Sequence, residues 1–192
     1  MKLVLLNDGR PGLLRDDGVV DVSQVVGPTS AGSGQEAMVA IITHFDDLQA
    51  DLSRLEKDGS VIPLSDVTLQ APLPRPSKIL CMGGNYREFG AREPAPMWGF
   101  LKAQDSVIGP GGTVVLPDVD ANIFHHEAEL VIVFGRGGKD VKQADAMDHI
   151  FGYMCGVDVS ARMPAGGGGG QRVPNTLPIS PSKSYDTFAP LG

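Results

Sequence analysis

A short proline-rich segment divides the chain into two parts, and it constrains the fold more than any other local feature. Residues 71–78 read APLPRPSK, with prolines at positions 72, 74 and 76. Proline fixes φ and disfavours helix in the residue before it, so this segment is expected to be extended and stiff. We therefore predict a small N-terminal domain over residues 1–71, a linker over 72–77 and a larger domain over 78–192.

The part before the prolines has the pattern of a small α/β unit. MKLVLL and GVVDVS are predicted strands on either side of a turn at NDGRPG. Ser33 and Glu36 form a capping-box pattern, which predicts the start of an amphipathic helix that ends near Gly59. Its apolar stripe consists of Met38, Ile41, Ile42, Phe45, Leu48, Leu52 and Leu55. Core packing explains this stripe, and nothing in this part indicates catalysis.

The charge balance excludes several classes of partner. The formal net charge is −7 and the sequence pI is about 5.0, without a basic cluster, so we expect neither nucleic acid nor an anionic membrane as a partner. No apolar stretch approaches the roughly 18 residues that a membrane-spanning helix needs. MKLVLLNDGRPG lacks the pattern of a signal peptide. Cys81 and Cys155 have no CxxC spacing, so we expect reduced, buried thiols in a cytoplasmic protein.

The part after the prolines reads as short strands and turns. Predicted strands are KILCMGG, HHEAELVIVF and GYMCGVDVS, and GFLK is a further short apolar segment. SVIGPGGTVVLP predicts a strand, a turn and a second strand. QADAMDHIF predicts a short helix. Residues 164–182 contain GGGGG and are too irregular for an ordinary connection, which is typical of lids, binding loops or disordered segments. The glycine run lacks the Lys-Ser/Thr pair of a phosphate-binding loop, so it is weak evidence for phosphate binding.

Two glutamates stand at the start of an otherwise apolar predicted strand. Side chains alternate along a strand, so Glu127 and Glu129 point to the same face with their Cα atoms about 6.6 Å apart. Partly buried carboxylates at this spacing repel each other unless a cation, a shared proton or a basic side chain neutralises them. Mg²⁺, Mn²⁺ and Ca²⁺ prefer such oxygen ligands. The alternative is a strand end at which both carboxylates face water.

Further charged residues could complete such a site. Asp158 follows the apolar run of GYMCGVDVS and Arg162 stands four residues on, which suits a ligand and an anchor as well as a turn residue and a surface arginine. Lys183 follows the glycine-rich segment and could hold a ligand oxygen, although most lysines are solvated. His125 shares the face of the two glutamates, but a histidine at a strand start is more often simply exposed.

Five segments, in this order, resemble the fumarylacetoacetate hydrolase family. They are ILCMGGNY, FLKAQDSVIGPGG, HHEAELVIVFG, AMDHIFGYMCGVDVSAR and KSYDTFAPLG, and they extend over residues 78–192. The resemblance implies an α+β fold, with a β-rich catalytic core of mixed sheets behind a small N-terminal α/β domain. It also implies a homodimer, as is usual in the family.

The resemblance further implies a metal site and a class of reaction. By position, the ligands of Mg²⁺ (or Mn²⁺ or Ca²⁺) would be Glu127, Glu129 and Asp158. Arg162 would stabilise oxyanion charge, Lys183 and Thr187 would border the metal, and Tyr86 would line the substrate pocket. The family acts on 2-oxo and β-diketo acids through a metal-stabilised enolate, by C–C bond hydrolysis, decarboxylation or isomerisation. The alternative is an inactive scaffold or fragment that serves as an interaction module.

The chain departs from the family pattern at three places. Phe89 stands where many members have the histidine of a water-activating dyad, which leaves the general base open, with Glu88 or Glu93 as substitutes. No glutamine follows DVSAR as it does in the founding hydrolase. Family members also continue beyond APLG, so we expect a fragment, a processed product or a form completed from elsewhere.

Overall fold

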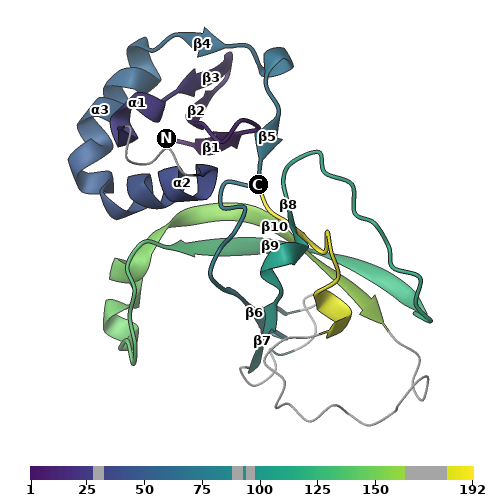
Figure 1. Ribbon diagram of the computed structural model, residues 1–192. Coiled ribbons are helices and arrows are strands. Elements are labelled where there is room, and N and C mark those ends of the chain that lie inside the picture. The colour runs from purple at the N-terminus through teal and green to yellow at the C-terminus, as the bar shows by residue number, and fades with distance from the viewer. Residues whose placement is uncertain (28–32, 88–92, 94–97, 163–180) are drawn as a thin grey trace.

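The computed structural model of this chain describes residues 1–27, 33–87, 93, 98–162 and 181–192 (Figure 1). The first part is a five-stranded antiparallel sheet with strand order β4-β3-β2-β1-β5. Its strands are β1 (Leu3–Leu6), β2 (Pro11–Arg15), β3 (Gly18–Asp21), β4 (Val61–Ile62) and β5 (Leu69–Gln70). The predicted strands at MKLVLL and GVVDVS are confirmed as β1 and β3. The strand β2 was not predicted, because its residues were assigned in part to the turn.

Three helices accompany this sheet: α1 (Ser23–Val26), α2 (Gly34–Thr43) and α3 (Phe45–Asp58). The predicted N-cap is confirmed, since the Ser33 side chain accepts a hydrogen bond from the Glu36 N–H at 3.3 Å. The prediction of one continuous helix is wrong, because the chain breaks at His44. This break turns Phe45 toward Phe151, which it meets edge-on with ring centroids 5.1 Å apart.

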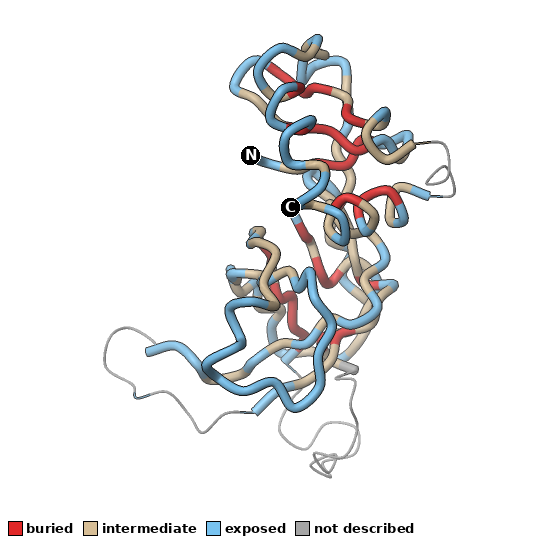
Figure 2. Tube along the Cα trace, turned by 90° about the vertical axis from the view of Figure 1, so that its left-hand side faces the viewer, coloured by how far each residue is buried: buried red, intermediate tan, exposed pale blue. Residues whose placement is uncertain are grey.

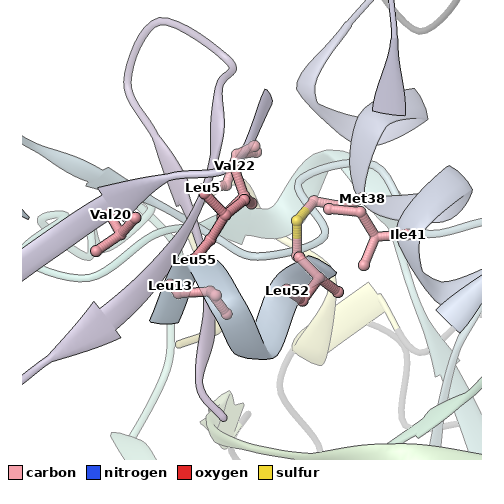
Figure 3. Packing of buried hydrophobic residues seen from close by; sticks show 8 residues of the cluster. All are labelled: Leu5, Leu13, Val20, Val22, Met38, Ile41, Leu52 and Leu55. Carbon is pink, nitrogen blue, oxygen red and sulfur yellow. The ribbon is translucent and has the colours of Figure 1, made fainter. Parts of the chain in front are cut away.

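The main apolar core lies between the sheet and helices α2 and α3 (Figure 3). Its buried members come from β1, β2, β3, the residue after β3 and the two helices: Leu5, Leu13, Val20, Val22, Met38, Ile41, Leu52 and Leu55. A smaller cluster of Val4, Leu6 and Val19 covers the opposite face of the sheet. Burying such side chains stabilises each by roughly 1.5–3 kcal/mol relative to exposure. Among the described helices, none is long and apolar enough to cross a membrane.

Within the described residues, the second part contains three strand pairs together with 3₁₀ turns. The pairs are β6 (Ile79–Gly83) with β7 (Trp98–Lys102), β8 (Val107–Ile108) with β11 (Ala189–Pro190), and β9 (Ile123–Phe134) with β10 (Ile150–Arg162). The 3₁₀ turns of this part are η4 (Gln104–Ser106), η5 (Gln143–His149) and η6 (Pro181–Lys183), whereas η2 (Leu64–Asp66) lies between β4 and β5 in the first part. Figure 1 shows the long β9–β10 ribbon curving past the N-terminal sheet and helices.

Two local predictions in this part are wrong. The hairpin predicted at SVIGPGGTVVLP does not form, because β8 pairs in parallel with β11 from the end of the chain. The short helix predicted at QADAMDHIF is the 3₁₀ turn η5, and its last two residues already belong to β10. Helices and strands nevertheless segregate along the chain, which confirms the predicted α+β class with a sheet-rich second part.

The two parts differ in how much they bury (Figure 2). In the second part, the described apolar cluster consists of Val159, Ala161 and Phe188, with Phe124 and Tyr185 packed at its margin. Cys81 is half-buried, whereas Cys155 is exposed, which corrects the prediction of two buried thiols. Both cysteines are free, as predicted. Cys155 is exposed because it lies on the same ribbon face as the exposed residues Leu130 and Tyr153.

Candidate metal centre

The register of the β9–β10 ribbon brings the three predicted carboxylates together. Asp158 lies directly opposite Glu127, and Gly156 lies opposite Glu129. Opposed residues of an antiparallel pair project to the same face, and so do residues two apart on one strand. Glu127, Glu129 and Asp158 therefore share one face of the ribbon. Asp158 is about 30 residues from the two glutamates in sequence, and the pairing of β9 with β10 brings it beside them.

Burial of this face differs from one carboxylate to the next. Asp158 is buried, with 6% of its surface exposed, whereas Glu127 and Glu129 are half-buried. Burial raises the pKa of Glu129, and the neighbouring carboxylates of Asp158 and Glu127 raise it further. The Lys183 ammonium acts in the opposite direction. Glu129 thus faces an excess of negative charge, the electrostatic situation that favours a bound cation.

The Lys183 ammonium lies among the predicted metal ligands. Its Nζ donates to Glu127 Oε2 at 3.2 Å, to an oxygen of Asp158 and to the Ser160 hydroxyl. It also lies 4.8 Å from the centre of the Phe100 ring. Lys183 is therefore not a solvated surface lysine, because it is 9% exposed and cross-links two strands of the site.

The position of Lys183 is set by its neighbours in sequence. The residue ends the turn η6, and the next residue, Ser184, accepts a hydrogen bond from the Ala103 N–H at 3.1 Å. Further on, the Phe188 carbonyl accepts a hydrogen bond from the Val159 N–H at 3.2 Å. Phe188 is fully buried against the ribbon. The segment after η6 is thus fastened to both β10 and the end of β7, which brings the Lys183 side chain over the carboxylates.

A second lysine was missed by the sequence analysis. Lys102, the last residue of β7, donates from Nζ to Asp158 Oδ1 at 2.6 Å and to the Val159 carbonyl at 3.0 Å. Its side chain is 2% exposed, and burial lowers its pKa while the Asp158 carboxylate opposes that shift. The available signal was a lysine at the end of the apolar stretch GFLK. Such a position costs free energy unless the charge is paired.

Arg162 and His125 lie at the more exposed end of the carboxylate cluster. The Arg162 guanidinium donates to Glu127 Oε1 at 3.3 Å and, from Nε, to His125 Nδ1 at 3.4 Å. His125 Nδ1 is 3.8 Å from Glu127 Oε1. The arginine side chain is 50% exposed, so part of its hydrogen-bonding capacity faces solvent. His125 lies beside the cluster and is only half-exposed, in contrast to the expectation of a simply exposed side chain.

The structure does not bring the other predicted residues to the cluster. Tyr86 follows β6 and is 52% exposed. The Thr187 hydroxyl accepts a hydrogen bond from the Val115 N–H at 2.9 Å, so it fastens a loop. Thr187 has φ 70°, an uncommon value for a β-branched residue. Glu93 is exposed and pairs with Arg87 at 3.1 Å.

Several predicted features lie outside the described residues. They are Phe89, Glu88 and the glycine-rich segment up to residue 180. Cys81 does lie near the cluster, where burial and the Asp158 carboxylate raise the pKa of its thiol to about 11. A thiol with so high a pKa is a poor nucleophile at neutral pH.

The donor set suits a hard divalent ion, but the side chains are not gathered around one. In the ranges that the structure describes, no three His, Cys, Asp or Glu side chains are arranged to hold a metal. Lys183 and Lys102 instead neutralise two of the three negative charges. Carboxylate oxygens on one face are the ligands that Mg²⁺, Mn²⁺ and Ca²⁺ prefer. The chemistry of the set fits such an ion, provided that Lys183 moves.

Comparison with known proteins places the chain in a family. The model of the fumarylacetoacetate (FAA) hydrolase C-terminal domain matches residues 78–192. Protein Rv2993c of Mycobacterium tuberculosis is 42% identical over 138 residues, which cover 70% of this chain and 48% of that protein. Human mitochondrial oxaloacetate tautomerase FAHD2A is 38% identical over 136 residues, which cover 69% of this chain and 41% of that protein. The chain thus spans less than half the length of these curated relatives.

A solved structure resembles the whole chain. Maleylpyruvate hydrolase from Sphingobium sp. SYK-6, in complex with manganese(II) and pyruvate, superposes with a TM-score of 0.80 and 31% identity. The match covers 100% of this chain and 65% of that protein. A probable 2-hydroxyhepta-2,4-diene-1,7-dioate isomerase from Mycobacterium abscessus superposes with a TM-score of 0.74 and 25% identity. Since the family model matches more than half of the residues, this chain belongs to the fumarylacetoacetate hydrolase family.

Proposed function

We propose that this protein is a divalent-metal-dependent enzyme that acts on a 2-oxo or β-diketo acid by way of an enolate. The observation that carries the proposal is the set of three carboxylates on one face of the β9–β10 ribbon, with the most buried of them, Asp158, opposite Glu127. The similarity to a hydrolase solved with manganese(II) and pyruvate supports a divalent ion. Mg²⁺ or Mn²⁺ is the ion we propose, with Ca²⁺ as a further candidate.

In this proposal Glu127, Glu129 and Asp158 hold the ion. A divalent ion at this place supplies Lewis-acid stabilisation for the negative charge that develops as a 2-oxo acid becomes its enolate. Arg162 contributes a half-exposed guanidinium directly beside Glu127. A guanidinium binds carboxylates through paired hydrogen bonds, so Arg162 would orient the substrate carboxylate and balance its charge. Lys183 would supply a second cation for the developing oxyanion.

The reactions of the family, namely hydrolysis, tautomerisation and decarboxylation, differ in what they require of a general base. Hydrolysis requires a water that a general base has activated. Tautomerisation needs no activated water, but it needs a group that carries a proton between carbon and oxygen, whereas decarboxylation forms the enolate without removing a proton from carbon. Glu93, one candidate base, is exposed and paired with Arg87. The similarity to oxaloacetate tautomerase supports tautomerisation, with hydrolysis and decarboxylation as further candidates, and oxaloacetate is the first substrate to test. The proposal includes a cytoplasmic homodimer, for which composition and family resemblance are the grounds.

Turnover and metal binding test the proposal together. Mg²⁺- or Mn²⁺-dependent conversion of oxaloacetate or acetylpyruvate should be measurable by ultraviolet absorbance of the enol. Glu127→Ala and Asp158→Ala should abolish metal uptake in calorimetry. The control is Asp120→Ala, at an exposed aspartate of the same second part of the chain, and it should leave metal uptake unchanged. Full retention of metal by either site variant would overturn the ligand assignment.

An inactive scaffold is the second candidate. It is supported by the exposed apolar side chains of the ribbon, among them Leu130 at 63% and Phe134 at 66% exposure. Such patches often mark interaction surfaces. Intact metal binding without turnover of any 2-oxo or β-diketo acid tested would favour this second function over the first.

A further inference from the structure

The two carboxylate oxygens of Asp158 are held by two different lysines. Oδ1 accepts from Lys102 at 2.6 Å, and Oδ2 accepts from Lys183. Both ammonium groups are buried, and the carboxylate between them is buried as well. Each of these contacts is a charge-assisted hydrogen bond, the strong kind in proteins. A metal ion at Asp158 would therefore have to share a carboxylate oxygen with an ammonium group unless one lysine gives up its contact.

The surroundings of the two lysines indicate which one is fixed. The Lys102 side chain is 2% exposed, and its second acceptor is the Val159 carbonyl, which belongs to the β10 backbone. Its side chain could move only by leaving a backbone carbonyl and a buried carboxylate unpaired. The Lys183 side chain is 11% exposed, and its acceptors among the described residues are side-chain atoms, on Glu127, Asp158 and Ser160. These groups can exchange an ammonium for another cation without disturbing a backbone hydrogen bond.

The Lys183 ammonium also lies between two of the proposed ligands. It bonds to Glu127 and Asp158 at the same time, from the face of the ribbon on which Glu129 lies. A divalent ion coordinated by those carboxylates would meet this ammonium at close range and be repelled by it. With Lys183 withdrawn, the three carboxylates face the Lys102 ammonium and the half-exposed Arg162 guanidinium, so the cluster keeps a net negative charge that attracts a cation.

We propose, on the basis of the function proposed above, that the two lysines have opposite roles. Lys102 is a positioning residue that fixes Oδ1 of Asp158 and leaves Oδ2 for the ion. Lys183 is an internal counter-ion that neutralises the carboxylates of the metal-free protein and is displaced when the ion enters. Metal uptake is thus an exchange of one cation for another. The displaced ammonium stays beside the site, where it can reach an anionic substrate.

Calorimetry with Mn²⁺ on the 192-residue chain separates the two roles, because methionine keeps the length of lysine without its charge. Lys183→Met should bind Mn²⁺ about tenfold more tightly, since no ammonium has to be displaced. Lys102→Met should bind it about tenfold more weakly, because Asp158 loses the partner that orients it. Lys139→Met, at an exposed lysine in the connection between β9 and β10, is the matched control and should change nothing.

The single tryptophan of the chain gives a readout that does not depend on affinity. Trp98 packs on Phe100 with ring centroids 5.7 Å apart, and the Lys183 ammonium lies over that same Phe100 ring. Displacing the ammonium changes the electrostatic surroundings of the ring pair. Addition of Mg²⁺, which does not quench fluorescence paramagnetically, should therefore shift Trp98 emission in the wild type and leave it unchanged in Lys183→Met.

The outcomes distinguish this inference from the proposed function. Wild-type protein that binds no divalent ion would overturn both. Wild-type binding, with Lys183→Met binding no more tightly, would overturn the exchange and leave the metal site standing. If Lys102→Met fails to fold, judged by circular dichroism, the Lys183→Met calorimetry and the Trp98 emission decide the exchange on their own. Tighter binding by Lys183→Met, with the loss of its emission change, supports the inference.

Discussion

The N-terminal sheet and the β9–β10 ribbon bury different kinds of side chain. The N-terminal core is aliphatic, with residues such as Leu5, Ile41 and Leu52 fully buried. Among the described residues, every buried lysine or aspartate lies in the second part, namely Lys102, Asp158 and Lys183. That part also exposes large apolar side chains such as Leu130 and Phe134. Burial thus contributes stability in one region and sets the electrostatics of a site in the other.

The difference carries a lesson about where mutations act. Removing buried methylene groups costs transfer free energy and leaves a cavity, wherever the site lies. Removing one partner of a buried ion pair costs about as much or more, because the remaining charge is left without compensation. The first change should alter stability alone, whereas the second should alter stability and metal binding together. Matched substitutions in the two regions therefore test whether the regions differ in this way.

Asp158→Asn should have the largest effect. The substitution keeps the shape of the side chain but leaves the buried ammonium groups of Lys102 and Lys183 facing a neutral amide. We expect a loss of about 3–5 kcal/mol in the free energy of unfolding, as for other broken buried ion pairs, and no measurable metal binding. Urea unfolding in chelator and calorimetry measure the two losses. Asp120→Asn is the control, and a loss below about 1 kcal/mol at Asp158 would show that the two lysines do not depend on its charge.

Leu52→Ala should cost about 3 kcal/mol, the typical value for a fully buried leucine. The residue belongs to α3 and packs in the N-terminal core (Figure 3). Because this core contains none of the proposed ligands, calorimetry on the folded variant should give wild-type metal affinity. A large change in metal affinity would show that the two parts of the chain are energetically coupled, and the comparison above would fail.

The sequence patterns predicted what local chemistry determines. The capping box at Ser33, the strand containing Glu127 and Glu129, and the shared face of those two residues all follow from spacing along one segment. The approach of Asp158 to Glu127 was suggested by family resemblance, and the strand register accounts for it. The first three features needed no knowledge of distant parts of the chain, whereas the approach of Asp158 to Glu127 joins two different strands.

The features that were missed depend on contacts between distant segments. Lys102 and Asp158 are 56 residues apart, and the sequence around either residue does not indicate that the two form an ion pair. The parallel pairing of β8 with β11 takes a strand away from the hairpin that its own turn predicts. The break at His44 lies within an unbroken apolar stripe, and its effect is to aim Phe45 at a strand far along the chain. The spacing of residues within one segment cannot predict which distant segment that segment will pair with or pack against.

Glu129→Gln should produce a small, pH-dependent gain in the metal-free protein. Burial and the neighbouring carboxylates raise the folded-state pKa of Glu129 above its ordinary value of 4.5. Stability from this group is therefore fully present below its unfolded pKa and is lost as pH rises through the folded pKa. In chelator near pH 7, the variant should be more stable by a few tenths of a kcal/mol, and the two proteins should converge below about pH 4.

Two results would contradict this expectation. One is a gain that persists at low pH, since glutamine and protonated glutamic acid carry the same charge. The other is a loss of stability near neutral pH, which would mean that the Lys183 ammonium outweighs the surrounding carboxylates. The same variant should bind Mn²⁺ more weakly, because it lacks one of the three proposed ligands. If Glu129→Gln raises the free energy of unfolding of the metal-free protein and weakens Mn²⁺ binding, then Glu129 is a metal ligand whose charge is repelled by its neighbouring carboxylates.

Leu130→Ala should have the smallest effect and makes a matched pair with Leu52→Ala. Leu130 lies on the ribbon face opposite the carboxylates and is 63% exposed, so little apolar surface returns to water on substitution. We expect a change within about 0.5 kcal/mol in urea unfolding. A loss close to that of Leu52→Ala, above all one that depends on protein concentration, would mean that this face is covered in solution. The contrast between an aliphatic core in one part and a charged interior in the other would then describe only the isolated chain.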